Sequence, residues 1–420
     1  MYKKIVLDNG VRVVMEKMTS LKSVAIGVWA RVGSRDEEVG QEGFSHFVEH
    51  MMFKGTRKRT ASQISHEIDT LGGEMNAFTT HEVTVFYVKV LDQQISPAAE
   101  LLADLFGHSR FPKKEIEKEK QVVLEEIRTV KDDPEDFVHE LHAKDVLGSH
   151  PLGRSILGER RSMESLRRPD LLRYRCAHYH PHKTVISVAG NVDQSRLIQL
   201  LNKNFGTWSG EKNEKGFAQI SPWPEKPYRK KHIHTKKLEQ VHLCLGFKGL
   251  PVGHPDRYSA NILNTILGGG VSSRLFQEIR ENRGLAYTIY SHLSSFSDGG
   301  NLTVYAATRP EEAESVVSQV CKEIQKLCKQ GLNAKELERT KTQLKGNLMM
   351  GLEGTYGRMN KLAKDELFQG RRVTLQEMLR EIDKITLDHV WSLSKQLFDF
   401  QGLALTALGP IPQKAFPNWE

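Results

Sequence analysis

Hydrophobic and polar residues alternate with a two-residue period in two stretches of the first half. Residues 2–17, YKKIVLDNGVRVVMEK, alternate on both sides of Asn9-Gly10, and Asn-Gly is the preferred two-residue turn of a β-hairpin. Residues 74–91, EMNAFTTHEVTVFYVKVL, are rich in β-branched and aromatic side chains, which favours a strand. The sequence therefore predicts an N-terminal hairpin and a strand over 74–91, in which His81 is expected to be exposed.

Segments with helical periodicity follow these strands. Residues 60–71 predict one helix, with Thr60 in the position of an N-cap. Residues 96–111 and 113–130 predict two more, divided by Pro112. The first α/β unit then ends near Trp208. Its remaining predicted elements are helices at 137–147, 169–179 and 197–205 and a strand at 184–192.

The second half repeats the pattern of the first. Residues 209–228 have the Gly, Lys, Glu and Pro bias of a linker. Beyond them, residues 241–247 resemble the strand-like 24–30, and 301–308 with the helix that follows resemble 83–91. This is the pattern of a diverged duplication with a period of roughly 200 residues. We expect an α+β fold of two homologous domains, each an antiparallel-type sheet packed against helices. The predicted parts are a catalytic domain, 1–208, a linker, 209–230, and a second domain, 231–420.

Composition places the chain among globular proteins and excludes two classes of partner. Its length of 420 residues predicts two or more domains. Its content of 39% hydrophobic and 27% charged residues is typical of a globular protein. No run of eighteen apolar residues occurs, so no membrane span is expected. The net charge of +8 could indicate nucleic-acid binding. However, the basic residues are interleaved with 52 acidic ones and form no basic arm or RNP motif, so we expect no nucleic-acid partner.

The N-terminus and the cysteines indicate a cellular compartment. The first residues alternate like a strand and contain no apolar signal core. The four cysteines are scattered, without a C-x-x-C pair, which fits a reducing environment. We therefore expect a bacterial-type cytoplasmic protein with no signal or transit peptide. The cysteines are Cys176, Cys244, Cys321 and Cys328.

The segment with the most chemical content is GFSHFVEHMMFKGT, residues 43–56. On a helix, His46, Glu49 and His50 lie on one face, because they are at positions i, i+3 and i+4. Two converging imidazoles are good Zn²⁺ ligands, and a neighbouring carboxylate can take a proton from water. Their neighbours are apolar, so the helix is expected to be largely buried, where unpartnered polar groups are costly. Alone, this motif leaves open an ordinary pair of histidines without a metal.

The predicted helix 113–130 contains glutamates that could provide a third metal ligand. Glu119 and Glu126 are seven residues apart and share a face, whereas Glu125 lies about 100° away and is expected to face water. Glu126 is near the edge of the buried side. The alternative is a solvated acidic face with lysine partners.

These residues resemble a known family. His46, Glu49 and His50, with Glu126 76 positions after His50 (126 − 50 = 76), resemble the inverted-motif zinc peptidases of the pitrilysin family, and within it the mitochondrial-processing-peptidase-like branch. The resemblance implies that His46, His50 and Glu126 bind one Zn²⁺ per chain. It also implies that Glu49 is the general base and that Glu119 orients a ligand imidazole. It covers nearly the whole chain, through the segments LDNGVRVV, GGEMNAFTTHEVTVFY, PLGRSILG, VAGNVD and RENRGLAY.

The same resemblance assigns substrate-binding and second-half residues. Asn76 and Ala77 match an edge strand on which the family binds peptides by β-augmentation; the alternative is an ordinary strand with a polar turn. Arg280 and Tyr287 match a pair that polarises the scissile carbonyl; the alternative is a surface arginine and a core tyrosine. The counterpart of the motif helix, residues 258–270, contains no His, Glu or Asp, so the second domain is expected not to bind metal.

We therefore expect a zinc metalloendopeptidase with processing-peptidase-like and LuxS-like architecture. Its substrates would be peptides or extended, unfolded segments, cleaved in the manner of presequence processing. Chains of this size in the family are similar to half of a closed chamber, which implies a homodimer or a heterodimer with an inactive paralogue. The alternative is a non-catalytic scaffold or assembly subunit. Retention of His46, Glu49, His50 and Glu126 argues against it.

Overall fold

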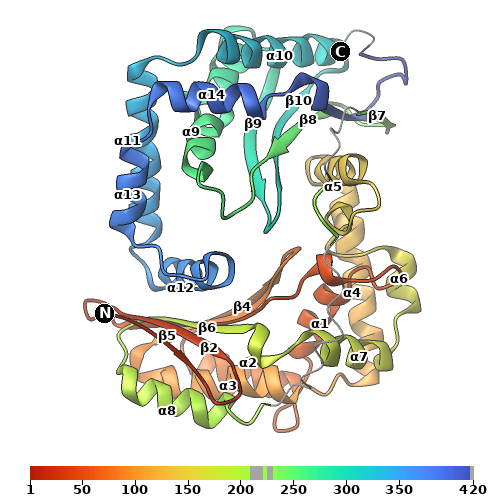
Figure 1. Ribbon diagram of the computed structural model, residues 1–420. Helices are drawn as coiled ribbons and strands as arrows, with labels where there is room; N and C mark the ends of the chain where they lie inside the picture. The colour runs from red at the N-terminus through yellow and green to blue at the C-terminus, as the bar shows by residue number, and fades with distance from the viewer. Residues whose placement is uncertain (209–220, 225–229, 417–420) are drawn as a thin grey trace. The chain divides into compact units, whose positions relative to one another are not determined.

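The computed structural model describes residues 1–208, 221–224 and 230–416, which form two compact units (Figure 1). The first consists of the described parts of Met1–Thr129, Arg154–Ile220 and Met350–Arg372, and the second of the rest. This division differs from the predicted segments 1–208 and 231–420, because residues 130–153 pack with the second unit and 350–372 with the first. Most of the predicted linker, 209–230, lies outside the described residues.

The first unit is built on a six-stranded sheet in the order β1-β2-β6-β3-β5-β4. Only β2 and β6 pair in parallel. The predicted hairpin at Asn9-Gly10 is confirmed, since β1 pairs antiparallel with β2. The strands are β1 (Tyr2–Val6), β2 (Arg12–Lys17), β3 (Ser23–Ala30), β4 (Glu74–Thr79), β5 (Thr84–Leu91) and β6 (Thr184–Gly190).

The prediction of one strand over 74–91 is wrong, because the segment folds into the hairpin β4–β5. Its turn is closed by Thr80, whose Oγ1 accepts hydrogen bonds from the N–H groups of Glu82 and Val83. The polar residues at 79–82 thus end one strand and begin the next. As a result β4 becomes an edge strand, paired with β5 alone among the described strands.

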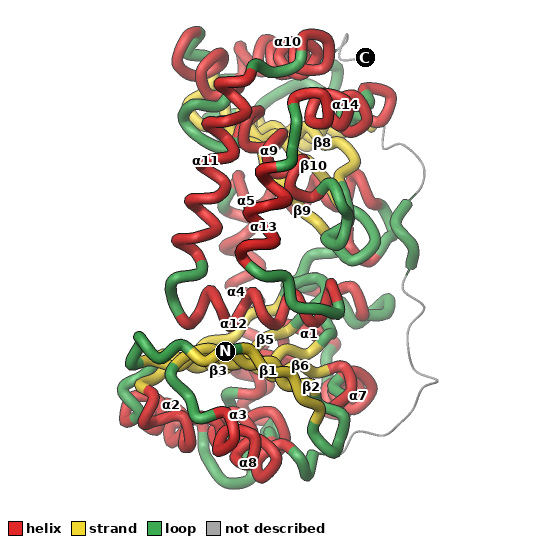
Figure 2. The backbone as a smooth tube through the Cα atoms, turned by 60° about the vertical axis from the view of Figure 1, so that its left-hand side comes forward, coloured by secondary structure: helices red, strands yellow, loops and turns green. Residues whose placement is uncertain are grey.

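Helices cover both faces of this sheet. Figure 2 shows α2, α3 and α8 on one face and α12 on the other. The first face carries the main core, in which Phe47, Met51, Phe86 and Phe106 are buried. Thr60 caps α2 as predicted, accepting from the N–H of Gln63. The helices are α1 (Phe44–Met52), α2 (Ala61–Thr70), α3 (Ile95–His108), α4 (Lys113–Asp132), α6 (Arg160–Ser165), α7 (Arg168–His178), α8 (Gln194–Phe205) and α12 (Thr355–Lys364).

Helix α12 comes from the second half of the chain but belongs to the first unit (Figure 1). Its Met359 packs on Trp29, and Gly27 of β3 lies so close that an added Cβ would be 2.6 Å from the Met359 sulfur. Glu366, which follows α12, is buried and pairs with Lys4 at 2.8 Å and Arg12 at 3.1 Å. This second face of the first sheet is therefore closed by a segment that comes at least 165 residues after the strands it covers (355 − 190 = 165).

The second unit repeats the topology of the first. Its five-stranded sheet has the order β7-β11-β8-β10-β9, and again only the first pair, β7–β11, is parallel. This order matches β2-β6-β3-β5-β4 strand for strand, which confirms the predicted α+β fold of two homologous sheets. The strands are β7 (Lys230–Thr235), β8 (Val241–Gly249), β9 (Ala286–Ser295), β10 (Gly300–Thr308) and β11 (Ala404–Gly409).

The helices of the second unit also occupy corresponding positions. Helix α9 follows β8 as α1 follows β3, and it packs on β9 as α1 packs on β4. Helix α5 packs on β8 and β11, on the face of the second sheet opposite to α9. The helices are α5 (Pro134–Leu147), α9 (Arg257–Gly268), α10 (Ala313–Gln330), α11 (Ala334–Gly351), α13 (Leu375–Asp383) and α14 (Leu387–Leu397).

The layer between α5 and its sheet contains buried histidines. His142 hydrogen-bonds to Thr406 Oγ1 at 3.0 Å, and His139 to the Tyr290 hydroxyl at 3.0 Å. Burial, followed by the charge of His139, lowers the pKa of His142 to about 3. Burial and His292 lower the pKa of His139 to about 4. Both imidazoles are therefore neutral at pH 7.

We predict that the second unit loses stability in mild acid. The histidine pKa values are lower in the folded than in the unfolded chain, so the unfolded chain binds more protons below about pH 6.5. Each of the two histidines should remove roughly 1–2 kcal/mol between pH 7 and pH 5. Urea denaturation at several pH values should show a shallower pH dependence for His142→Gln. His66→Gln, on exposed α2, is the control, and equal slopes for wild type and His142→Gln would contradict the prediction.

Candidate metal centre

Helix α1 presents His46, Glu49 and His50 together. Its other side is anchored in the core, since Phe47, Val48, Met51 and Met52 are fully buried. The Nε2 atoms of His46 and His50 are 3.1 Å apart. Burial, followed by the charge of His50, lowers the pKa of His46 to about 3. Its imidazole is therefore neutral at pH 7, the form that binds metal.

Glu126 on α4 completes a triangle of donor atoms. Its Oε2 lies 3.7 Å from the Nε2 atoms of both His46 and His50. A tetrahedral zinc ion with bonds of about 2.0–2.1 Å separates its ligand atoms by roughly 3.3 Å, so the three distances suit this ion. No other such cluster of metal-ligating groups occurs in the described part of the chain. Glu125 instead is exposed and pairs with Arg128, as its helical position predicts.

Glu119 holds one of the two imidazoles in place. Its Oε1 is 2.9 Å from His50 Nδ1, and its Oε2 is 2.7 Å from Lys54 Nζ. Burial raises the pKa of Glu119, but the hydrogen bonds from His50 and Lys54 outweigh it and leave the pKa below its usual value. With Nδ1 engaged by the carboxylate, Nε2 of His50 faces Glu126. Burial lowers the pKa of His50, but Glu119 and then Glu126 leave it raised.

His46 lacks such a partner. Its Nδ1 is buried and has no hydrogen-bond partner in the described part of the chain. The direction of this imidazole is therefore fixed by packing and by the placement of the α1 backbone.

Glu49 points toward β4. Its Oε2 accepts a hydrogen bond from Thr79 Oγ1 at 2.5 Å. Burial raises the pKa of Glu49 above its ordinary value, although the Thr79 hydrogen bond opposes the shift. A carboxylate with a raised pKa is a better proton acceptor near neutral pH.

The β4 residues singled out in the sequence lie on the edge of the first sheet. Asn76 is exposed and Ala77 half-buried, and both pair with β5 on one side only among the described strands. His81, in the following turn, was expected to be exposed, and this is wrong. It hydrogen-bonds to Ser34 Oγ at 2.8 Å, and burial lowers its pKa to about 4.

Arg280 and Tyr287 belong to the second unit and contact each other. Arg280 lies in a π-helical turn, Phe276–Asn282. Its guanidinium carbon is 4.6 Å from the ring centre of Phe276 and 4.7 Å from that of Tyr287. Tyr287 is 75% exposed, which rules out the alternative of a core tyrosine.

Two residues around the centre were missed in the sequence. Lys54 contacts Glu119 and Thr79 contacts Glu49. Lys54 stands in the motif segment 43–56, and Thr79 in the segment GGEMNAFTTHEVTVFY. Lys54 follows His50 by four positions, which could have signalled a cation near the same carboxylate. Thr79 carried no comparable signal, because its contact depends on how β4 packs beside α1.

The structure is that of a protein with two homologous α+β halves, the first of which carries a donor triangle that could hold a metal ion. The family described as "Insulinase (Peptidase family M16)" matches residues 12–160, and "Peptidase M16 inactive domain" matches residues 165–344. The "Uncharacterized zinc protease YmxG" of Bacillus subtilis is 43% identical over 98% of both chains. A Streptomyces coelicolor protein, also named an uncharacterized zinc protease, is 37% identical over 98% of this chain and 90% of its own length. The chain belongs to the M16 peptidase family.

Solved structures agree with this fold. "A protease from Helicobacter pylori" superposes with a TM-score of 0.93 at 23% identity, over 98% of this chain and 99% of the other. A chain of "Complex III2 from Candida albicans" superposes with a TM-score of 0.83 at 22% identity, over 97% and 96%. In the described residues, no helix is long and apolar enough to cross a membrane.

We predict that adjacent glutamates of α4 differ sharply in metal binding. Glu126→Gln removes a donor from the triangle and should weaken zinc binding by about 100-fold or more. Glu125→Gln changes the same charge one position away, on the exposed side, and should leave the affinity within about twofold. Zinc competition against a chromophoric chelator measures both. Equal affinities for the two variants would exclude Glu126 as a ligand.

Proposed function

We propose that this chain is a zinc metalloendopeptidase that hydrolyses peptides or extended segments of unfolded proteins. The observation that carries the proposal is the triangle of His46, His50 and Glu126 donors beside the buried carboxylate of Glu49. A zinc ion held there, one per chain, would supply Lewis-acid activation of water and of the peptide carbonyl.

Glu49 is the proposed general base. It takes a proton from the attacking water and passes a proton to the leaving amine. Two features support this role: burial raises the pKa of Glu49, and Thr79 holds one carboxylate oxygen so that the other can face the reacting atoms. Glu119 orients the His50 imidazole through its contact with Nδ1. Lys54 stabilises the negative charge of Glu119 and so keeps this carboxylate in place.

The proposed substrate site is the free edge of β4. An extended peptide can add to such an edge through main-chain hydrogen bonds at Asn76 and Ala77. Thr79, at the end of the same strand, contacts Glu49, so a peptide on this edge would run toward the catalytic carboxylate. A segment whose backbone is already paired within a folded protein must unpair before it can add to this edge, which favours peptides and unfolded segments as substrates.

Arg280 and Tyr287 are proposed to stabilise the oxyanion of the reaction. The two aromatic rings around the guanidinium hold it in place, while Tyr287 remains exposed. We propose a homodimer, or a heterodimer with an inactive paralogue, in which the partner supplies these two residues. The four cysteines are unpaired, which suits the proposed cytoplasmic location.

A non-catalytic scaffold is the second candidate. A chain of "Complex III2 from Candida albicans" has the same fold, so this fold also occurs within a larger complex. The intact donor triangle and Glu49 favour the enzyme, since a scaffold needs neither.

We predict that Glu49→Gln abolishes cleavage without removing the metal. A quenched-fluorescent peptide library should be cut by wild type and at least 100-fold more slowly by Glu49→Gln, while both carry about one zinc per chain. Glu125→Gln, on the exposed side of α4, is the matched charge control and should cleave normally. Zinc without cleavage in wild type would point to a missing paralogue, and neither zinc nor cleavage would favour the scaffold.

A further inference from the structure

Helix α1 begins without a side-chain cap of its own. Its N-cap is Gly43, which has φ +90° and no side chain to offer, and the first N–H groups of a helix need acceptors. The acceptor is Glu37, six residues upstream. Its Oε2 accepts from the N–H of Gly43 at 2.9 Å, and its Oε1 accepts from the N–H of Ser45 at 2.8 Å. Glu37 is 3% exposed, so both oxygens are committed to the backbone of the motif helix.

The loop PLGRSILG, residues 151–158, contacts both Glu37 and the start of α1. Arg154 Nη1 donates to the backbone oxygen of Glu37 at 2.7 Å. Gly158, with φ +80°, lies so close that an added Cβ would be 2.2 Å from the Glu42 carbonyl oxygen. An added Cβ on Gly43 would be 2.5 Å from the carbonyl oxygen of Leu157. The loop and the start of α1 are therefore packed backbone to backbone, and Glu37 is hydrogen-bonded to both.

The segment that carries Glu37 also holds the turn after β4. The N–H of Ser34 donates to the Thr80 oxygen at 3.2 Å, and the N–H of Arg35 donates to the His81 oxygen at 2.9 Å. Residues 34–37 thus bind both α1, which carries His46 and Glu49, and the end of β4, where Thr79 holds Glu49.

We propose that Glu37 is a positioning residue for the metal centre: by fixing the first turn of α1, it places His46 against Glu126. This rests on the proposed function. His46 is one residue beyond the N–H group that Glu37 binds, and among the described residues its own Nδ1 has no hydrogen-bond partner. His50 is oriented independently by Glu119. A shift at the start of α1 therefore moves the His46 imidazole, which has no carboxylate on its Nδ1 to hold it as Glu119 holds His50.

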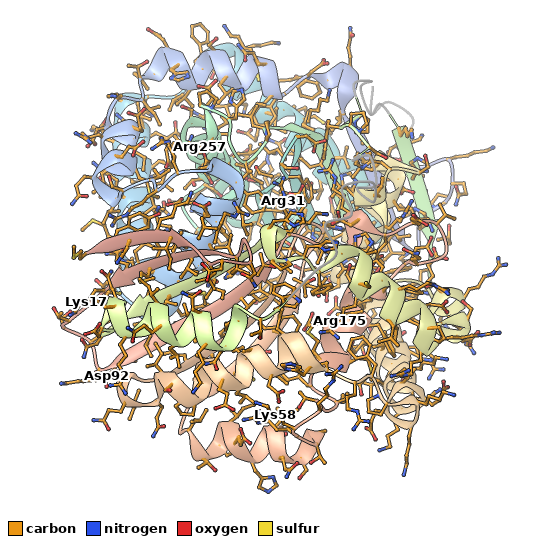
Figure 3. The ribbon with its side chains drawn as sticks, turned by 60° about the horizontal axis from the view of Figure 1, so that its bottom comes forward. Lys17, Arg31, Lys58, Asp92, Arg175 and Arg257 are labelled. Carbon is orange, nitrogen blue, oxygen red and sulfur yellow. The ribbon has the colours of Figure 1, made fainter. Side chains whose placement is uncertain are left out.

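Asp193 provides a matched control. It caps α8 by accepting from the N–H groups of Ser195 and Arg196, two backbone donors as for Glu37. It borders a surface pocket that Lys17 and Asp92 also line. Figure 3 shows Lys17 and Asp92 together at one end of the first unit, away from Arg175 on α7, the helix that packs on α1. Asp193→Ala therefore removes a helix cap in the same unit without touching the centre.

The experiment compares Glu37→Ala, Glu37→Gln and Asp193→Ala in the full chain. Zinc dissociation constants come from chelator competition, thermal midpoints from the zinc-free proteins, and kcat and KM from one cleaved peptide. We expect Glu37→Ala to weaken zinc binding by about tenfold, as loss of outer-shell support does, and to lower kcat more than KM. Glu37→Gln, which can accept from one N–H only, should fall between. Asp193→Ala should lower the thermal midpoint but leave zinc affinity and kcat within about twofold.

Several outcomes would overturn the inference. Glu37→Ala with unchanged zinc affinity would make Glu37 a stability cap only. An equal loss of affinity in Asp193→Ala would assign the effect to general stability. If Glu37→Ala does not fold, Glu37→Gln decides by the same affinity comparison. Wild type that binds zinc without cleaving would point to a missing paralogue and leave the comparison of zinc affinities intact, whereas wild type that binds no zinc would overturn both the proposed function and this inference.

Discussion

The metal centre depends on one constraint: α1 must be apolar on one side and carry three polar groups on the other. The apolar side is fully buried, which at about 25 cal/mol per Å² of apolar surface fixes the helix in the core. The polar side then lies at the edge of that core, where unpartnered groups are costly. Glu119 provides a hydrogen-bond partner for His50, and Thr79 provides one for Glu49. The buried Nδ1 of His46 has no hydrogen-bond partner within residues 1–208, 221–224 and 230–416, so the position of this imidazole depends most on its backbone.

Two ion pairs link Lys54, Glu119 and His50: Lys54 pairs with one Glu119 oxygen and His50 with the other. The carboxylate is 6% exposed, so its two short ion pairs are screened much less than surface pairs. Lys54 stabilises the charge on Glu119, and that charge in turn fixes the tautomer of His50. Glu126, by contrast, is 39% exposed, and this open side gives small ligands access to the donor triangle.

Local patterns in the sequence predicted the elements near the centre. The i, i+3, i+4 spacing placed the polar trio on one helix face, and the seven-residue spacing set Glu126 apart from Glu125. The Asn9-Gly10 turn and the Thr60 cap were predicted for the same local reason. Contacts between distant segments were not predictable. Arg154 and Glu37 are 117 residues apart, and no local pattern in either segment predicts that the two residues are in contact. The division of 74–91 into two strands was missed because its turn has no Gly or Pro, and is closed instead by the Thr80 hydroxyl.

The placement of α12 has a consequence for synthesis of the protein. Trp29, Val85 and Tyr87 lie on the sheet face that α12 covers, yet α12 begins at Thr355. Chains emerge from the ribosome at roughly 5–20 residues per second, so this apolar face stays open for tens of seconds after β3 and β5 have been made. During that interval the nascent first unit presents an aromatic sheet surface of the kind that aggregates or is bound by chaperones. The first unit is completed only when about nine-tenths of the chain exists, so a truncated product would lack its cover even with every metal ligand present.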